Sequence, residues 1–284
     1  MNDPLEPPTA HWPPGTEVEH VTFAREPPPG QPALAELPGP GGKHAVLVRA
    51  AAPEKRARPA PAGDLLVLCV PAPEHEDADL LARARDWVDG AVPETGPASQ
   101  MVALHGAQVF WARGCVALVA PPERRAAVRR ALLEFAHVEA ELRAIETDLG
   151  ARWPELEADA PLAFEFDEGA ARKKQQLAQR FLQVLALRAR LARITPQVLC
   201  PHVHPPTLAS QIGERLRERT RVAQRLEFAG GQLEVFERVY EQCGQRASDF
   251  GLARTGHTLE WIIIVLLFAQ IVLVSVELMA ALGK

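Results

Sequence analysis

The residues of this chain whose types could bind a metal ion lie close together in the segment LCPHVHPP. Cys200, His202 and His204 fall within five positions there, and zinc commonly takes cysteine and histidine ligands. A structural zinc site needs a full tetrahedral ligand set, and no second cluster in the sequence supplies the remainder. The neighbouring prolines favour an extended loop. We therefore treat these three residues as weak candidate metal ligands and expect no cofactor.

Basic side chains gather in the middle of the chain and could bind a polyanion. Residues 165–225 contain twelve Lys and Arg against five Asp and Glu, whereas the segments on both sides are net acidic. Clustered cations attract RNA, a ribosomal surface or anionic lipid and release counterions. A solvated surface with local Glu pairing is the alternative. The candidate polyanion-binding residues are Arg172, Lys173, Lys174, Arg215, Arg217, Arg219 and Arg221.

No catalytic signature accompanies these residues. The sequence lacks the GxxxxGK[ST], GxSxG and HExxH patterns, and each of these patterns carries a specific chemistry. LPGPGGKH at 37–44 is glycine-rich but has no Ser or Thr after its lysine, so we do not expect a phosphate-binding loop there. We predict a protein that is not an enzyme and has no small-molecule substrate. A membrane-tethered enzyme with an unrecognised site is an alternative.

Short apolar runs between residues 44 and 120 predict a sheet. The runs AVLVRAA, LLVLCV and QVFWARGCVALVA are typical of strands, and EHEDADLLARARDWVDG between the second and third predicts a helix. This order predicts a small α/β or α+β domain over 44–120. Residues 1–40 hold 11 of the 26 prolines, which favours extended backbone. We therefore predict a mostly disordered tail over 1–43, with one strand in VEHVTFARE.

Beyond Pro121 the apolar residues recur in alternating steps of three and four, which is typical of packed helices. The spacing predicts a first helix, a connector around Trp153, Pro154 and Pro161, and a basic helix over about 168–194. A last helix keeps the spacing from Val222 onward without a slip. We expect it to continue through Gly230-Gly231, although two glycines cost about 1 kcal/mol each against alanine.

The region 121–256 is thus predicted to be a coiled-coil-like stalk or helical bundle. In the last helix of this region, the apolar residues line one face and form a candidate seam for packing against another helix. That seam could join copies of the chain in a homo-oligomer, or it could lie inside an intramolecular bundle, and the spacing alone is compatible with both. The seam residues are Leu226, Leu233, Phe236 and Tyr240.

The segment 257–284 is predicted to be a transmembrane helix. Its apolar stretch, 261–282, has 22 residues; at roughly 1.5 Å each they rise about 33 Å, enough for a roughly 30 Å hydrocarbon core. We assign Glu260 and Trp261 to the membrane interface, because an indole suits the headgroup region. The N-terminus shows no signal-peptide pattern. We expect a single-pass protein of the inner (plasma) membrane with its N-terminal bulk in the cytoplasm.

Parts of the sequence resemble the family named for proteins "required for meiotic nuclear division", whose bacterial members are called YagE-like. The similar pieces are HTLEWIIIVLLFAQIVL, QVFWARGCVALVA, IGERLRERTRVAQRLEF and LEVFERVYEQCGQRASDF. The resemblance covers roughly residues 100–284, and Gln270 stands where family members usually carry an acidic residue. It implies a membrane-anchored homo-oligomer, and mitochondrial members are associated with translation by organellar ribosomes. It supplies no catalytic residues.

These observations predict an α+β protein with a small N-terminal sheet domain, a long helical stalk and one C-terminal transmembrane helix. We predict a tail-anchored, oligomeric scaffold or tether at the lipid bilayer, whose basic helices contact a ribosome, RNA or a protein partner. A magnesium-channel-like ion transporter is a further alternative. It would need a second membrane helix and a Gly-Met-Asn loop, and the sequence contains no such tripeptide.

Overall fold

The computed structural model describes residues 12–282 except 32, 38–41, 54–56, 58–60, 62, 74, 76, 93–97, 165–172 and 200–206, and in the last helix it leaves out the side chains of 247, 250–255, 258 and 276–282. The chain is a mixed α+β protein that divides into two compact units. The first unit comprises Met1–Thr147 with Arg190–Ala229, and the second comprises Asp148–Ala189 with Gly230–Lys284.

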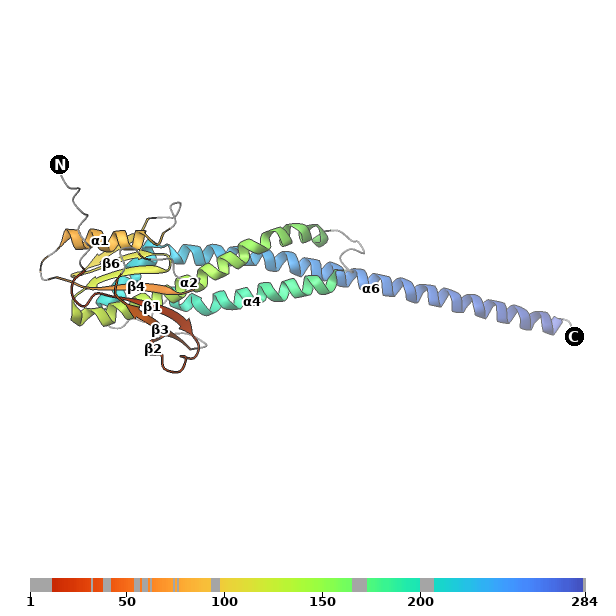
Figure 1. Ribbon diagram of the computed structural model, residues 1–284. Helices are drawn as coiled ribbons and strands as arrows, with labels where there is room; N and C mark the ends of the chain where they lie inside the picture. Colours follow the sequence, from red (N-terminus) through yellow and green to blue (C-terminus); the bar gives the residue numbers. More distant parts are fainter. Residues whose placement is uncertain are drawn as a thin grey trace, which may run out of the picture. The chain divides into compact units, whose positions relative to one another are not determined.

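The first unit is built on a seven-stranded sheet with the order β2-β3-β1-β4-β7-β6-β5 (Figure 1). Neighbouring strands are antiparallel except for β4 and β7, which are parallel. The helix α1 (Ala78–Asp89) lies in the connection between these two strands, as parallel neighbours require a crossover. The strands are β1 (Glu17–Ala24), β2 (Ala33–Leu37), β3 (Lys43–Ala51), β4 (Leu65–Pro71), β5 (Gln100–Leu104), β6 (Ala107–Ala112) and β7 (Cys115–Ala120).

The sheet extends into the region that composition placed in the tail. The strand expected in VEHVTFARE is confirmed as β1, but β2 also forms there, which corrects the expectation of a mostly disordered 1–43. β1 pairs with β3 on one side and β4 on the other, and Val21 is completely buried. This strand is therefore central, because its backbone groups are paired on both sides.

Two tight turns shape the far side of the sheet. The run 108–120, expected as one strand, is a hairpin of β6 and β7 that turns at Arg113 and Gly114, where Gly114 has a φ of 72°. β5, which was not expected, joins β6 through His105 and Gly106, with φ values of 47° and 78°. Positive φ at both residues of a two-residue loop matches the twist of antiparallel strands.

Both faces of the sheet are covered by helices (Figure 1). On one face, Trp87 and Val88 of α1 belong to a buried cluster with Leu68 and Phe110 from the strands. The Asp77 side chain caps this helix by accepting from the backbone N–H groups of its first turn. On the opposite face, the rings of Trp111 in β6 and Phe135 lie 4.7 Å apart in an edge-on contact.

Helix α2 (Pro122–Asp159) is longer than predicted. The connector expected at Trp153 and Pro154 is wrong, because the helix continues through both residues and is followed by the 3-10 turn η1 (Ala160–Ala163). Pro154 removes one backbone hydrogen bond. In the second unit the Trp153 ring packs edge-on against Phe236, with centroids 5.0 Å apart, and this contact favours keeping Trp153 helical.

The remaining helices are α4 (Lys174–Leu199), α5 (Leu208–Arg219) and α6 (Val222–Leu282). Thr207 and Ser210 form a reciprocal capping box at the start of α5. α6 confirms one continuous helix through Gly230 and Gly231. A helix can tolerate two glycines when the packing of the flanking turns supplies the stability that the glycines do not.

Candidate functional site

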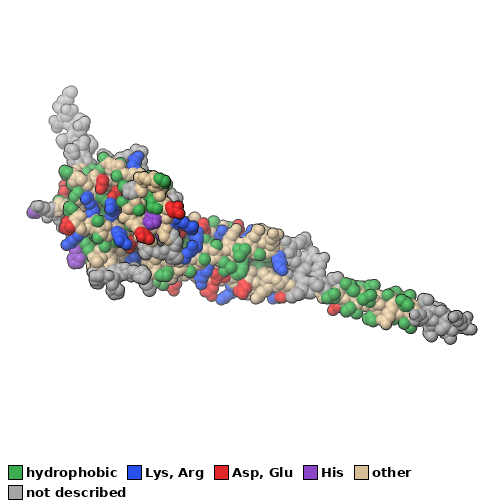
Figure 2. Space-filling model, turned by 90° about the horizontal axis from the view of Figure 1, so that it is seen from below, with side chains coloured by type: hydrophobic (Ala, Val, Ile, Leu, Met, Phe, Trp, Pro, Cys, Tyr) green, Lys and Arg blue, Asp and Glu red, His purple; other side chains and the backbone are tan. Residues whose placement is uncertain are grey.

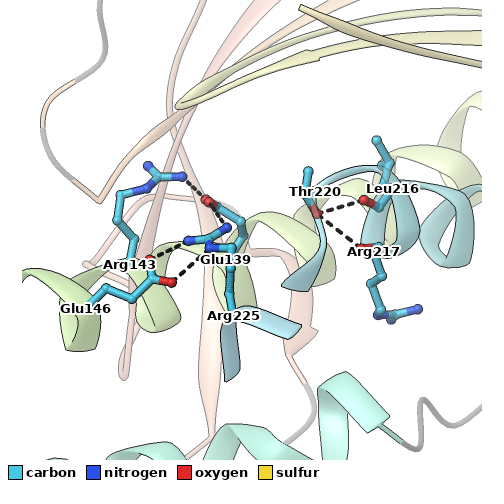
Figure 3. A network of polar contacts seen from close by, with 7 residues as sticks. All are labelled: Glu139, Arg143, Glu146, Leu216, Arg217, Thr220 and Arg225. Atoms are coloured by element: carbon cyan, nitrogen blue, oxygen red, sulfur yellow. Dashed lines mark hydrogen bonds and ion pairs between the residues drawn. The ribbon is translucent and has the colours of Figure 1, made fainter. Parts of the chain in front are cut away.

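A cluster of charged side chains joins the start of α6 to the middle of α2 (Figure 3). Arg225 donates to Glu146 through two nitrogens, Nε to Oε1 at 2.8 Å and Nη2 to Oε2 at 2.6 Å. Its third nitrogen, Nη1, donates to Glu139 Oε1 at 3.1 Å. Arg143, one turn after Glu139, donates to the other oxygen of Glu139. All of these residues belong to the first unit.

The cluster is only partly accessible to water, and this sets its electrostatics. The Glu139 side chain is 6% exposed, so its charge requires close partners. The hydrogen bond to Glu146 raises the pKa of Arg225 despite the opposing effect of burial. Burial lowers the pKa of Arg143, against the charge of Glu139. The positive charges of the two guanidinium groups compensate the negative charges of the two carboxylates. We therefore interpret the cluster as a structural contact between helices and not as a proton-transfer site.

A second, partly buried ion pair lies at the start of β3. Lys43 Nζ donates to Glu141 Oε1 at 2.5 Å, and Arg190 of α4 lies 3.5 Å from Glu141 Oε2. Burial works to raise the pKa of Glu141, but the hydrogen bond and charge of Lys43 lower it on balance. Nearby, burial and then the charge of Lys43 lower the pKa of His137 to about 4. His137 packs its ring on Phe23, so this imidazole is neutral at neutral pH.

The predicted polyanion-binding residues fall in both units. Lys173 and Lys174, at the start of α4, are exposed in the second unit. Arg172 lies outside the described residues. The four predicted arginines of α5 and the turn after it belong to the first unit, so the seven predicted residues do not share one compact unit.

The four arginines around α5 have different surroundings. Arg215 is paired with Glu218 at 3.0 Å. Arg217 is partly buried, its pKa is lowered by burial, and its Nη1 atom lacks a hydrogen-bond partner. Arg219 and Arg221 are exposed and form no ion pair with another described residue. These last two are the arginines best placed to meet an external anion.

The turn that carries Arg221 is sharply defined. Thr220 Oγ1 donates to the Leu216 carbonyl at 2.7 Å and approaches that of Arg217 at 3.5 Å (Figure 3). Arg221 follows with a φ of 53°, in the left-handed region that residues with a side chain seldom adopt. The Arg221 carbonyl then accepts the N–H of Arg225. The turn thus places Arg221 outside while bringing Arg225 onto the carboxylates of α2.

The predicted seam of α6 is internal. Leu226, Leu233, Phe236 and Tyr240 are each at most 7% exposed within a single chain. Phe236 packs on Trp153, as described above. The expectation that these four positions join copies of the chain is therefore corrected, and the intramolecular alternative describes them. The reason is that a stripe with this spacing buries itself equally well against helices of its own chain.

The described cysteines are buried thiols. Burial raises the pKa of Cys69 to about 12 and that of Cys243 to about 11, and it also raises the pKa of Cys115. Such thiols carry little of the thiolate form that attacks substrates or binds metals. The predicted metal ligands Cys200, His202 and His204 lie outside the described residues. Within the described residues, no group of His, Cys, Asp and Glu could hold a metal ion.

The exposed part of α6 begins with a small polar cluster. Trp261 Nε1 donates to His257 Nε2 at 3.3 Å, and His257 Nδ1 lies 3.4 Å from Glu260 Oε2. From Leu259 to Val274 every large hydrophobic side chain is 46–68% exposed, and Figure 2 shows hydrophobic side chains gathered on the visible face of this part of α6. Within the described residues, no helix combines the length and the apolarity that a membrane span requires.

Sequence reasoning missed the clamp between Arg225 and the two glutamates. The spacing of Glu139 and Arg143, four apart on one helix, was a visible signal for an ion pair. Arg225 was visible only as part of the basic stretch, because Glu146 lies 79 residues away in the sequence.

The fold and these contacts define a mixed α+β protein in whose first unit the start of α6 is clamped to α2. Comparison of the chain with protein-family models and with curated proteins finds no match to either. The resemblance to the YagE-like family therefore stays a prediction.

Proposed function

We propose that this chain is a non-enzymatic scaffold that is anchored in a lipid bilayer by the apolar end of α6. The observation that carries the proposal is the exposure of every large hydrophobic side chain from Leu259 to Val274, up to 68% for Phe268. These side chains surround the helix instead of following one stripe. A helix that is hydrophobic all round is typical of a buried or membrane environment.

The energetic argument favours a covered helix. Exposed apolar patches beyond a few hundred Å² are rare on soluble monomers, and burying one large apolar side chain completely stabilises by roughly 1.5–3 kcal/mol. Burial of the thirteen described large hydrophobics from Leu259 to Val274 would gain on the order of 20 kcal/mol. The predicted span runs on to Leu282, through residues whose side chains are not described.

The polar cluster at the start of the apolar part supports an interfacial position. Trp261 presents an apolar ring and a donor that is already directed to His257, and tryptophan is enriched at membrane interfaces. Arg246 and Arg254 precede the apolar part and Lys284 follows it, which favours a cytoplasmic location for the N-terminal side of the helix under the positive-inside rule. We propose that the first unit and the part of the second unit that precedes Leu259 lie in the cytoplasm, and that the apolar end of α6, which belongs to the second unit, lies in the plasma membrane.

The scaffold would present the exposed cations around α5 to an anionic partner such as RNA or a ribosomal surface. Arg219 and Arg221 support this part of the proposal, because both are exposed and have no ion pair with a described residue. By contrast, Arg225 is occupied by Glu146 and Glu139. An exposed, uncompensated arginine lowers the free energy of approach of a polyanion.

Extraction of membranes from cells that express the full chain tests the anchor. We expect the chain to resist alkaline carbonate and high salt, and the double variant Ile263→Lys/Leu267→Lys to become extractable. Leu182→Lys is the matched control, because Leu182 is similarly exposed, at 64%, but lies on α4. Release of the unaltered chain by carbonate alone would refute membrane anchoring.

RNA that co-purifies with the full chain in mild detergent tests the anionic partner. We expect RNA at low salt, loss at high salt, and loss at low salt when Arg219 and Arg221 are changed to Glu. Arg238→Glu serves as the control, since Arg238 is exposed on α6 and pairs with Glu234. If the two variants and the unaltered chain carry the same RNA, the cations around α5 do not bind it.

A further inference from the structure

The apolar part of α6 contains a carboxamide that has no hydrogen-bond partner among the described residues. Gln270 is the polar residue between Trp261 and Val274, its side chain is exposed, and it forms no hydrogen bond with another described residue. The hydroxyl of Ser275, farther along, is already satisfied, because it donates to the Ile271 carbonyl at 2.8 Å. Among the described side chains from Ile262 to Ser275, Gln270 is therefore the polar group whose hydrogen-bonding capacity the helix itself does not satisfy.

An unpaired amide becomes costly once the helix enters a bilayer, and this step depends on the proposed function. Gln270 lies nine residues after Trp261, about 14 Å along the helix, which is close to the middle of a roughly 30 Å hydrocarbon core. Water is absent at that depth, so two N–H donors and one carbonyl acceptor lose their partners. A group that pairs with the Gln270 carboxamide in the membrane must therefore both accept and donate hydrogen bonds.

The residues on either side of Gln270 form a seam that suits a neighbouring helix. Ile263, Leu266, Gln270 and Leu273 follow one another in steps of three, four and three, the pattern of alternate core positions in a two-stranded coiled coil. The three apolar members are 56–63% exposed. Isoleucine at one core position and leucine at the other favours two parallel strands, and a polar residue at a core position fixes the register.

We infer that this seam binds the same seam of a second copy, so that the two Gln270 carboxamides hydrogen-bond to each other inside the membrane. Two copies inserted with the same topology are parallel, which brings each residue opposite its own counterpart. A carboxamide is complementary to itself, since its N–H₂ donates to the carbonyl of the other. The seam buried within the chain, with Phe236 and Tyr240, is separate and already occupied.

The dimer is tested first by changing Gln270 in the full chain and measuring the dimer fraction in mild detergent against protein-to-detergent ratio. Gln270→Leu should weaken association about 3- to 30-fold, the range for hydrogen bonds between membrane helices. Gln270→Asn retains the carboxamide and should retain most of the association, and Ser275→Ala should leave it unchanged. Association that is equally strong in Gln270→Leu would overturn the inference.

Disulfide cross-linking in native membranes tests the geometry. In a Cys200→Ser background, Ile263→Cys, Leu266→Cys and Leu273→Cys should each cross-link on oxidation. Val265→Cys and Val272→Cys, off the seam, should cross-link far less. Cross-linking without this periodicity in a carbonate-resistant chain would overturn the dimer and leave the anchor standing. A chain that carbonate extracts would overturn both.

Discussion

Arg225, in the first turn of α6, holds both carboxylate oxygens of Glu146 with its Nε and Nη2 atoms, at 2.8 and 2.6 Å. This two-pronged contact has the geometry that only a planar guanidinium provides. Because Arg225 also reaches Glu139, which is 6% exposed, one side chain connects α6 to two positions of α2 that lie about two helical turns apart. We regard this contact as the main polar clamp of the first unit.

Replacement of Arg225 should therefore destabilise the first unit strongly. Arg225→Ala leaves the Glu139 and Glu146 charges with fewer partners, and we expect a loss of about 3 kcal/mol in the free energy of unfolding. Arg225→Lys should recover only part of this, because an ammonium cannot reproduce the two-pronged contact. Arg238→Ala, which breaks the exposed pair with Glu234, should cost under about 1 kcal/mol. Urea unfolding in mild detergent measures all three.

His137 should make stability depend on pH between about 6.5 and 4. Its pKa is near 6.5 in the unfolded chain and about 4 in the fold, mainly through burial. Stability from this group is complete above the unfolded pKa and is lost as pH falls toward the folded value, because only the unfolded chain then binds the proton. We expect a loss of about 3 kcal/mol by pH 4.

The variant His137→Phe should remove this part of the pH dependence. The variant Phe23→Leu should lower the free energy of unfolding but leave its pH dependence unchanged. Phe23 contacts the imidazole ring but does not titrate. Urea unfolding at several pH values between 7 and 4 distinguishes the two. Parallel curves for His137→Phe and the unaltered chain would show that the fold does not hold this imidazole neutral.

The left-handed backbone at Arg221 predicts a stabilising substitution. Its φ of 53° is strained for a residue with a Cβ, so Arg221→Gly should raise stability by about 0.5–1 kcal/mol despite the greater freedom of glycine in the unfolded chain. Arg215→Gly removes the same charge from the interior of α5 and should lower stability by about 1 kcal/mol. Changes of opposite sign in the unfolding temperatures of the two variants would support the backbone explanation. Equal decreases in the two unfolding temperatures would contradict it.

The internal seam predicts that Phe236 supports the fold and not the assembly. Phe236→Ala removes a fully buried ring that packs on Trp153, and we expect a loss of about 3–5 kcal/mol. Val235→Ala, at a position 47% exposed, should cost far less. Native mass in detergent should be the same for both variants and the unaltered chain. Dissociation caused by Phe236→Ala alone would place the seam between copies.

The sequence by itself determined the features that depend on local spacing. Steps of three and four predicted the helical second half, and they predicted that α6 continues through Gly230 and Gly231. Alternation and apolar runs predicted β3, β4 and β7 of the sheet. These features were readable because residues a turn apart on a helix, or two apart on a strand, share one face.

Only the tertiary structure decided which distant groups meet. Composition placed residues 33–37 in a tail, but pairing with β3 makes them a strand. The spacing of the α6 seam was compatible with packing between copies of the chain and with packing inside one chain. Burial of the seam residues within a single chain favours packing inside one chain. Arg225 and Arg221 look alike in the sequence, yet one is held by Glu146 and the other is exposed. Such differences arise from contacts between residues far apart in the chain, which local periodicity does not encode.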